Sequence, residues 1–301
     1  MRHILLFFLL AAPLVSCTGC DPSLSLTSVN RLSDSVPPSL LASKMTSGDK
    51  AELTFDEPLS KHCSFDQDGV QAQIDGSALL VTLPAPLGAG SPYTLSGRVK
   101  DQAGNSTRFT AVLWGVNLHP ATVLITQVST KGTKTQPDRV ELLVTKSGSM
   151  AGLTLQNGAE DLFTDRYVFP DEYAWKDSRY VVQFQKADEY LERTSEQLAG
   201  LGGDNGVLVL LDSPRRGAAL LDALVWSDRE SSAADGWGTE KVKASVEWIA
   251  AQGGWESTNV EDSIDSRQAT STRPFVRNGS KDTNRKDDWK TAPKGGATWG
   301  R

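Results

Sequence analysis

The chain contains few of the side chains that enzymes most often use for catalysis. It has three histidines and three cysteines in 301 residues. Neither His-Glu-x-x-His nor Gly-x-Ser-x-Gly, the motifs of zinc proteases and esterases, occurs in it. His62 and His119 are the two histidines outside the first three residues, and they stand 57 positions apart (119 − 62). We therefore expect a protein that is not an enzyme and that uses no cofactor.

Long hydrophobic runs are also scarce. The one clear run, Ile4 to Val15, follows the basic residues Arg2 and His3 and is interrupted only by Pro13. It is too short to cross a bilayer as a helix, which takes about 20 residues. A basic start followed by an apolar run of this length is typical of an export signal. No other run approaches the length of a membrane span, so we expect no second one.

The residues that end this run, Leu14-Val15-Ser16-Cys17, resemble the lipobox of bacterial lipoproteins. The resemblance implies that residues 1–16 are a signal peptide, cut just before Cys17, and that Cys17 carries a diacylglyceryl group and an amide-linked acyl chain such as palmitate. Two lipid attachments are enough for stable anchoring. The implied address is the bacterial cell envelope, with Thr18 favouring the outer membrane. An ordinary secretory signal that happens to contain Cys17 is the alternative.

Two cysteines remain if Cys17 is lipidated. An oxidising envelope permits Cys20 and Cys63 to form a disulfide, which would tie the segment after the anchor to the first domain. Two independent thiols are the alternative. The spacing Cys17-x-x-Cys20 would indicate a redox pair only if Cys17 kept its thiol.

Charge is distributed unevenly along the chain. Residues 17–266 contain 21 Lys and Arg against 34 Asp and Glu, a net charge of −13, whereas residues 267–301 contain 9 against 3, a net charge of +6. The acidic body argues against nucleic acid as the main partner. The basic end could contact a polyanion, or it could be the closing strand and loop of a domain. The residues proposed for that contact are Arg273, Arg277, Arg285, Lys286 and Lys290.

Alternating apolar residues predict β-strands in the first half. Residues 17–43 read as a tether, and residues 44–118 contain short alternating runs with an Asp75-Gly76 hairpin turn. The motifs Leu53–Leu59, Pro92–Leu95 and Asp101–Asn105 resemble bacterial immunoglobulin-like domains. The resemblance implies a β-sandwich.

The second half, residues 119–293, also reads as short strands. The motifs in this half resemble those of the lamin-tail domain, which is an immunoglobulin-like sandwich. Residues 294–301 are predicted to be a tail. The resemblance rests on Ile125–Val128, Asp138–Leu142, Phe169–Pro170 with Tyr180–Val182, Val209–Asp212 with Asp222–Trp226, and Asp282–Asn284 with Asp288–Trp289. The predicted fold class is therefore all-β, with two consecutive immunoglobulin-like β-sandwich domains behind a lipoprotein signal peptide and small helical inserts in the second.

Two inserts, 186–205 and 228–272, depart from a compact sandwich. Ala187 to Arg193 looks helical and is followed by glycines. The longer insert contains Trp237, Trp248 and Trp255, which are candidates for a partner surface. Packing of these tryptophans into the core is the alternative.

One acidic loop has the spacing of a weak calcium site. Asp66, Asp68 and Asp75 stand at alternating or terminal positions of an EF-hand-like loop. The flanking segments are predicted to be strands rather than helices, and Asp is too short for the bidentate last position. A solvated acidic turn is the default reading, and we expect no metal.

These patterns favour a non-catalytic, lipid-anchored envelope lipoprotein that mediates protein or surface interactions, as an adhesin or a scaffold. Its partners would be the membrane, through the anchor, and a protein in the envelope or outside the cell. The alternative is an accessory subunit that binds nucleic acid or another polyanion, or that positions a partner enzyme. Fold alone does not decide between them.

Overall fold

The structure is a computed structural model that describes residues 34–279 and 282–301. The proposed signal peptide 1–16, Cys17 and Cys20 lie outside the described residues. Lipidation of Cys17 and pairing of Cys20 with Cys63 therefore stay predictions. Within the described residues, no helix is both long and apolar enough to span a membrane.

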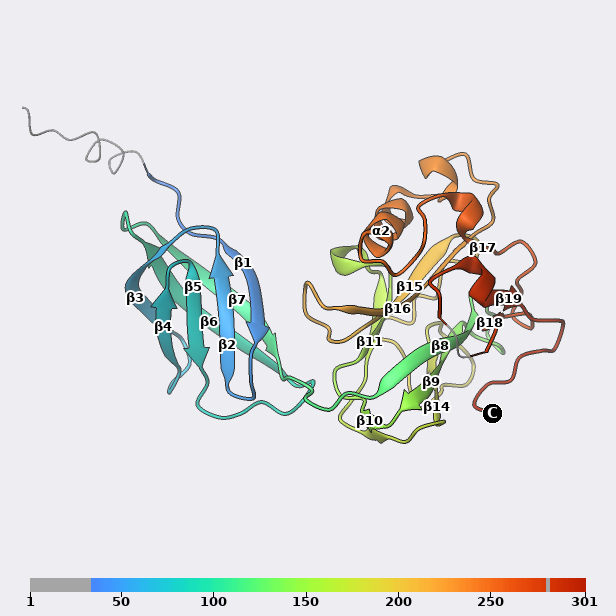
Figure 1. The fold of residues 1–301 in the computed structure, drawn as a ribbon, viewed down its shortest axis with the longest axis horizontal. Coiled ribbons are helices and arrows are strands. Elements are labelled where there is room, and N and C mark those ends of the chain that lie inside the picture. Colours follow the sequence, from blue (N-terminus) through green and yellow to red (C-terminus); the bar gives the residue numbers. More distant parts are fainter. Residues whose placement is uncertain (1–33, 280–281) are drawn as a thin grey trace, which may run out of the picture.

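The described chain forms two β-sandwiches, each around its own hydrophobic core (Figure 1). In the first, a four-stranded sheet of order β1-β2-β5-β4 faces a three-stranded sheet of order β3-β6-β7. The prediction of an all-β sandwich fold is confirmed. The strands are β1 (Leu40–Met45), β2 (Lys50–Phe55), β3 (Leu59–Phe65), β4 (Gln71–Asp75), β5 (Ala78–Thr82), β6 (Pro92–Asp101) and β7 (Ser106–Trp114).

Alternation of apolar residues places the core of the first sandwich. Ala51, Leu53 and Phe55 of β2 are all buried, as the period of two requires. Gly76 has a positive φ of 60° in the turn that joins β4 to β5, a conformation that favours glycine. Phe109 of β7 meets Phe55 edge-to-face at 5.8 Å, so aromatic packing joins the two sheets.

The second sandwich pairs two five-stranded sheets, of order β12-β11-β15-β16-β17 and β14-β9-β8-β18-β19, beside a small β10-β13 ladder. The strands are β8 (Thr122–Ser129), β9 (Arg139–Lys146), β10 (Gly148–Ser149), β11 (Thr154–Asn157), β12 (Asp165–Val168), β13 (Tyr173–Ala174), β14 (Arg179–Gln183), β15 (Gly206–Leu211), β16 (Leu220–Ser227), β17 (Ile264–Asp265), β18 (Phe275–Arg277) and β19 (Trp289–Thr291). The short 3-10 turns are η1 (Glu160–Leu162), η2 (Ala234–Gly236), η3 (Val260–Asp262) and η4 (Lys286–Asp288).

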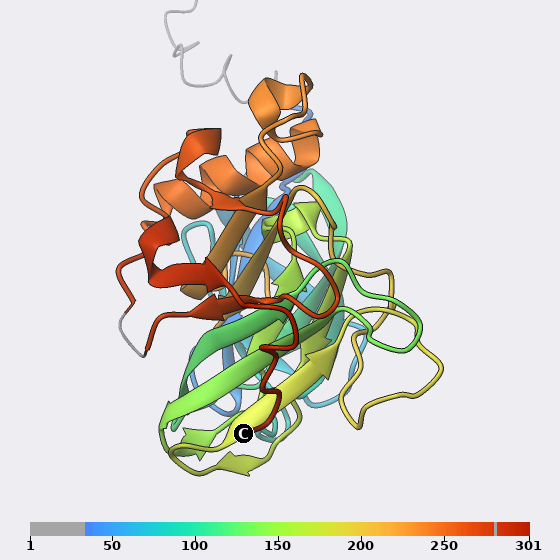
Figure 2. The same ribbon diagram turned by 90° about the vertical axis from the view of Figure 1, so that its right-hand side faces the viewer.

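The second insert contains an α-helix, α2 (Glu240–Ala251), which lies against β15 and β16 (Figure 2). Thr239 caps its start, because the Thr239 hydroxyl accepts a hydrogen bond from the Val242 N–H at 3.2 Å. Val246 and Ile249 are buried one turn apart on the face toward the sheet. Gly253, with a φ of +75°, follows the end of the helix.

The helix expected over Ala187–Arg193 does not form. The chain there runs beside β14 instead, through isolated bridges of Gln183 with Thr194 and of Gln185 with Ala199. The buried carboxylate of Asp165 accepts hydrogen bonds from the N–H groups of Gln197 and Ala199, at 2.9 and 3.2 Å. A seven-residue stretch is too short to be a stable helix by itself. This one is held beside β14, because the Gln183 side chain accepts from the Leu191 N–H at 3.1 Å and the Gln183 N–H donates to the Arg193 carbonyl at 3.0 Å.

A short linker joins the two sandwiches, and most of its hydrogen bonds are made with the second sandwich. The Asn117 side chain donates hydrogen bonds to the backbone carbonyls of Ser149 and Ala151, each at 3.0 Å. Pro120 forms a parallel bridge with Ser149. A Cβ atom on Gly90 would lie 2.5 Å from the Gly152 nitrogen, so the backbones of the two sandwiches approach closely there.

A buried ion pair connects the sheets of the second sandwich. Arg277 of β18 donates to both carboxylate oxygens of Asp222 of β16, each at 2.7 Å, and to the Ile125 carbonyl of β8, also at 2.7 Å. The two charged side chains are 1% and 0% exposed. Trp289 of β19 packs under the guanidinium at 4.5 Å, and Asp282 lies 2.9 Å from it. We call the Arg277–Asp222 pair the charge clamp.

The charge clamp predicts a large effect of removing one partner. Arg277→Met leaves the Asp222 carboxylate buried without its counter-charge, and we expect it to lower the free energy of unfolding by about 3–5 kcal/mol. Lys290→Met, on the exposed face of the adjacent strand, is the control and should change it by less than about 0.5 kcal/mol. Urea unfolding measures both. An Arg277→Met variant as stable as the control would contradict the role of the clamp.

A second prediction concerns Gly206 at the start of β15. A Cβ atom there would lie 2.4 Å from the buried ring of Trp226, whose indole N–H donates to the Gly202 carbonyl at 2.7 Å. Since the ring is fixed, Gly206→Ala should destabilise the protein by about 1–3 kcal/mol. Gly203→Ala is the matched control, because its nearest contact is an ordinary 3.5 Å. Equal melting temperatures of the two variants would refute the prediction.

Candidate partner-binding surface

Three large apolar side chains are exposed on neighbouring segments of the second sandwich. Leu118 of the linker is 71% exposed, Tyr173 of β13 57% and Trp175 68%. The segments lie side by side, because the Ser149 N–H of β10 donates to the His119 carbonyl at 2.8 Å and Ser149 pairs with Tyr173. We call Leu118, Tyr173 and Trp175 the aromatic patch.

The local sequence explains why both aromatic rings point outward. Ala174, between Tyr173 and Trp175, is fully buried, so period-two alternation sends its neighbours to the solvent side. The two rings meet edge-on, with their centres 4.8 Å apart. The Lys176 N–H donates to the Ser147 hydroxyl at 2.8 Å and fixes the chain immediately after Trp175.

The aromatic patch suits binding rather than catalysis. Exposed Trp and Tyr side chains supply large contact areas in protein interfaces, where they are often the residues that contribute most to affinity. The sequence analysis missed these residues. The signal that could have found them is the Tyr-Ala-Trp triplet, in which one small residue separates two aromatic residues.

The tryptophans that were predicted as a partner surface lie elsewhere. Trp237 and Trp255 are each 2% exposed, and Trp248 is half-buried against the same core. The indole N–H of Trp237 donates to the Thr258 carbonyl at 3.3 Å, and that of Trp255 to the Asp262 carbonyl at 3.1 Å. The prediction of a partner surface is therefore wrong for Trp237 and Trp255, because these indoles fill the space between the insert and the sheet.

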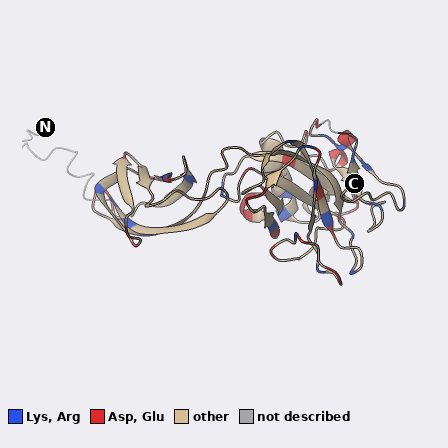
Figure 3. Ribbon diagram, turned by 90° about the horizontal axis from the view of Figure 1, so that it is seen from below, with Lys and Arg blue, Asp and Glu red and all other residues tan. Residues whose placement is uncertain are grey.

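The basic end of the chain does not form a continuous cationic surface. Arg277 is buried in the charge clamp, so its prediction as a polyanion contact is wrong. Arg285 pairs with Glu256 at 3.1 Å. Arg273 donates to the Ala292 carbonyl at 3.2 Å, and Lys290 is exposed on β19. Figure 3 shows acidic and basic residues interspersed over the second sandwich.

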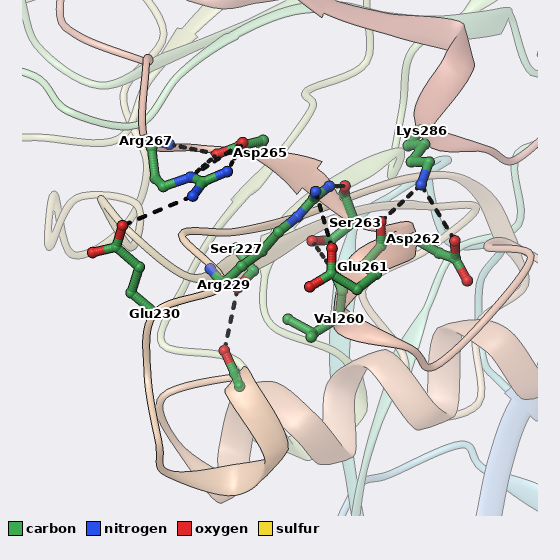
Figure 4. A network of polar contacts seen from close by, with 11 residues as sticks. Ser227, Arg229, Glu230, Val260, Glu261, Asp262, Ser263, Asp265, Arg267 and Lys286 are labelled. Carbon is green, nitrogen blue, oxygen red and sulfur yellow. Dashed lines mark hydrogen bonds and ion pairs between the residues drawn. The ribbon is translucent and has the colours of Figure 1, made fainter.

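Lys286 belongs to a polar network that fastens the second insert (Figure 4). Its ammonium group donates to the Glu261 carbonyl at 2.8 Å and lies 3.4 Å from Asp262. Next to it, Arg229 pairs with the Glu261 carboxylate at 3.2 Å and donates to the Ser263 carbonyl at 2.7 Å. Lys286 is thus already engaged within the protein.

The weak calcium candidates are not brought together. Asp66 pairs with Arg108 at 2.5 Å, whereas Asp68 lies in the turn before β4 and Asp75 at the end of that strand. Among the described residues, the carboxylates that do converge are those of Asp34, Glu57 and Asp101, within 4.8 Å of one another. These are the described residues that could hold a cation.

The convergence of these three carboxylates has an electrostatic consequence. Desolvation raises the pKa of Glu57, and the charges of Asp101 and Asp34 raise that pKa further. Asn105 offsets part of the repulsion, because its side-chain amide donates to the Asp101 carboxylate at 2.7 Å. Nothing in the local spacing of the sequence indicates this group, since its members come from three separate segments.

A buried carboxylate holds two loops of the second sandwich together. Asp138 accepts hydrogen bonds from the N–H groups of Gly132 and Leu201, at 2.5 and 2.8 Å. Burial raises its pKa to about 6, although both N–H donors act in the opposite direction. Asp138 belongs to the Asp138–Leu142 motif, and its role here is to position loops.

Comparison with known proteins places the second sandwich in a family. The family described as TP_1001 protein second domain matches residues 121–200 and 195–291, which together span more than half of the chain. The chain belongs to this TP_1001 second-domain family. The matched residues include β8 to β19, and therefore the charge clamp, β13 and the insert with α2.

No curated protein matches the chain. Among solved structures, the chain is similar to domains A168–A170 of titin, with 13% sequence identity and a TM-score of 0.20. The match covers 62% of this chain, and the chain spans 63% of the titin fragment.

The pKa of Asp138 predicts how stability depends on pH. Its folded pKa of about 6 lies above the ordinary value of 3.8, so the folded state holds the proton more tightly. The free energy of unfolding should fall as pH rises from about 4 to 6, by at most about 3 kcal/mol from this group, and then level off. In Asp138→Asn, the free energy of unfolding should fall less over this pH range. Urea titrations at several pH values measure the free energy of unfolding of both proteins. Identical pH profiles of the variant and the wild type would contradict the prediction.

Proposed function

We propose that the protein is a non-catalytic, lipid-anchored lipoprotein of the bacterial envelope that binds a protein partner through the aromatic patch. The observation that carries the proposal is the rigid display of Tyr173 and Trp175 on β13 and the turn after it. The export-signal pattern and Leu14–Cys17 support the anchor and the envelope address. We also propose that residues 119–293 form a lamin-tail-like domain, on the basis of the motifs that resemble that family.

The alternative, an accessory subunit that binds nucleic acid or another polyanion, has less support. Arg277 is buried, and Arg285 and Lys286 pair with acidic residues or carbonyls of the insert. A polyanion would have to displace those contacts before it could bind. A protein partner at the aromatic patch needs no such exchange, because the rings are already exposed.

The proposal is tested by site-specific photo-crosslinking with the full-length protein in its own cells. A photoreactive phenylalanine at position 175 should form an adduct with a discrete protein partner. The same residue at position 190 is the matched control, since Tyr190 is also an exposed aromatic residue (54%) but lies outside the patch.

The affinity of that partner should depend on the patch. We expect Trp175→Ala to weaken binding by about 2 kcal/mol, about 30-fold, and Tyr173→Ala to weaken it less, because Trp is the larger contact. Tyr190→Ala should leave the affinity unchanged. Equal crosslinking from positions 175 and 190, or an affinity that Trp175→Ala does not change, would refute a role for the patch.

A further inference from the structure

The outer face of the β14-β9-β8-β18-β19 sheet contains polar side chains that are buried. Gln127 and Ser129 of β8 are each 1% exposed, and Glu141 of β9 is 2% exposed. Gln127 pairs with Glu141 across the strands, and Ser129 with Arg139. Because cross-strand partners share a face, these four side chains lie together. We call Gln127, Ser129, Arg139 and Glu141 the polar face.

The end of the described chain crosses this face. Figure 2 shows residues near Arg301 passing in front of the sheet, and specific hydrogen bonds fix them there. The Thr298 N–H donates to Gln127 Oε1 at 3.2 Å, and the Gly300 N–H donates to Glu141 Oε2 at 2.7 Å. Between them, the Trp299 ring lies 5.1 Å from the guanidinium of Arg139. We call residues 294–301 the terminal segment.

These contacts recognise the backbone of the terminal segment, which ends in a turn, because the Arg301 N–H donates to the Thr298 carbonyl at 3.3 Å. Two N–H groups at alternate positions of the segment each reach a side-chain acceptor, and the side chain between them stacks on a cation. Glu141 is held in place by Arg179 at 2.6 Å and by the Thr126 hydroxyl at 2.8 Å, so the acceptor is preorganised. A peptide that makes the same turn offers N–H groups with this spacing.

The terminal segment does not satisfy all the hydrogen-bonding groups of the polar face. Gln127 Nε2 and Ser129 Oγ are buried and have no hydrogen-bond partner among the described residues. The Thr298 N–H on Gln127 Oε1 fixes which way the amide points, so the unpaired atom is a donor. An unpaired buried donor is costly, about 1–3 kcal/mol, and a backbone carbonyl would satisfy it.

The attachment of the terminal segment is also weak. Within residues 292–301 the structure has no strand that pairs with the sheet, and Gly295, Gly296 and Gly300 favour a disordered alternative. Its polar contacts with the polar face are those of Thr298 and Gly300. Few hydrogen bonds therefore have to be replaced when a peptide takes its place.

From these observations we propose that the polar face is a binding site for a peptide segment of a partner protein, which the terminal segment occupies until that peptide displaces it. The incoming peptide supplies N–H groups to Gln127 and Glu141 and a carbonyl to Gln127 Nε2. This site is distinct from the aromatic patch and does not depend on the function proposed above.

The test begins by releasing the terminal segment in the full chain. Gly300→Pro removes the N–H that Glu141 accepts and forbids the native φ of +71°, while leaving the sheet unchanged. Hydrogen exchange of the Thr298 amide, which donates to Gln127, should then accelerate about tenfold or more. Thr298→Pro is a second variant, which removes the N–H that Gln127 accepts and should accelerate exchange of the Gly300 amide in the same way.

Binding is then measured by calorimetry with a synthetic peptide of residues 294–301 added in trans. We expect it to bind Gly300→Pro at least about tenfold more tightly than the wild type, whose site is occupied. Glu141→Gln in the Gly300→Pro background should weaken binding about tenfold or more, whereas Lys290→Gln, on the same face but outside the site, should not. The Trp299→Ala peptide should bind more weakly than the parent peptide.

Two results would overturn the proposal. If both proline variants release the segment and the peptide still fails to bind, the polar face is not a peptide site. If release produces dimers that the peptide dissociates, the occupant is the terminal segment of a second copy and not a partner protein. Loss of the aromatic patch through Trp175→Ala should leave every one of these measurements unchanged, which separates the two sites.

Discussion

The charge clamp is the interaction on which the second sandwich depends. Arg277 and Asp222 come from different sheets, and the Ile125 carbonyl and N–H bond to both of them. A pair of opposite charges with no access to water is stable only when each has its partner, so strands β8, β16 and β18 must assemble in one register. Both side chains are buried, 1% and 0% exposed, and this burial raises the pKa of Asp222 against the pull of Arg277. The hydrophobic core of the second sandwich then packs around strands whose register is already fixed.

Much of the fold could be predicted because it depends on local patterns. Alternation in Ala51–Phe55 and the Asp75-Gly76 turn are sufficient to indicate strands and a hairpin. The charge clamp could not be predicted in this way, because 55 positions separate Asp222 from Arg277 and no local rule pairs them. Arg277 therefore looked like one more residue of a basic tail. The helix expected over Ala187–Arg193 was wrong for a related reason, since Gln183 of β14 bonds to Leu191 and Arg193 and determines the path of that segment.

The candidate sites were harder to predict than the fold. Tryptophans in a long insert suggested a partner surface, yet an insert that packs on a sheet needs large side chains to fill the space beneath it, and Trp237 and Trp255 do so. The exposed Trp175 directly follows the short β10-β13 ladder, which was not predicted from the sequence. Likewise, Asp34, Glu57 and Asp101 meet only after three segments fold together. The exposure of a side chain, and the meeting of side chains from distant segments, are properties of the folded chain. The order of residue types in the sequence therefore does not reveal them.

The linker has a mechanical consequence. Asn117 is already bonded to the second sandwich, and Gly115 is still bonded to Gly90 and Ser91 of the first, so Val116 is what remains as a joint. Tension applied at the amino-terminal side of the chain would pass through this joint into the segment that contains Leu118 and Pro120. That segment lies beside β10, which in turn pairs with Tyr173. Within the second sandwich, a pull on the chain would thus reach the aromatic patch before the rest of the sandwich. The affinity for a partner bound there would then depend on the applied force.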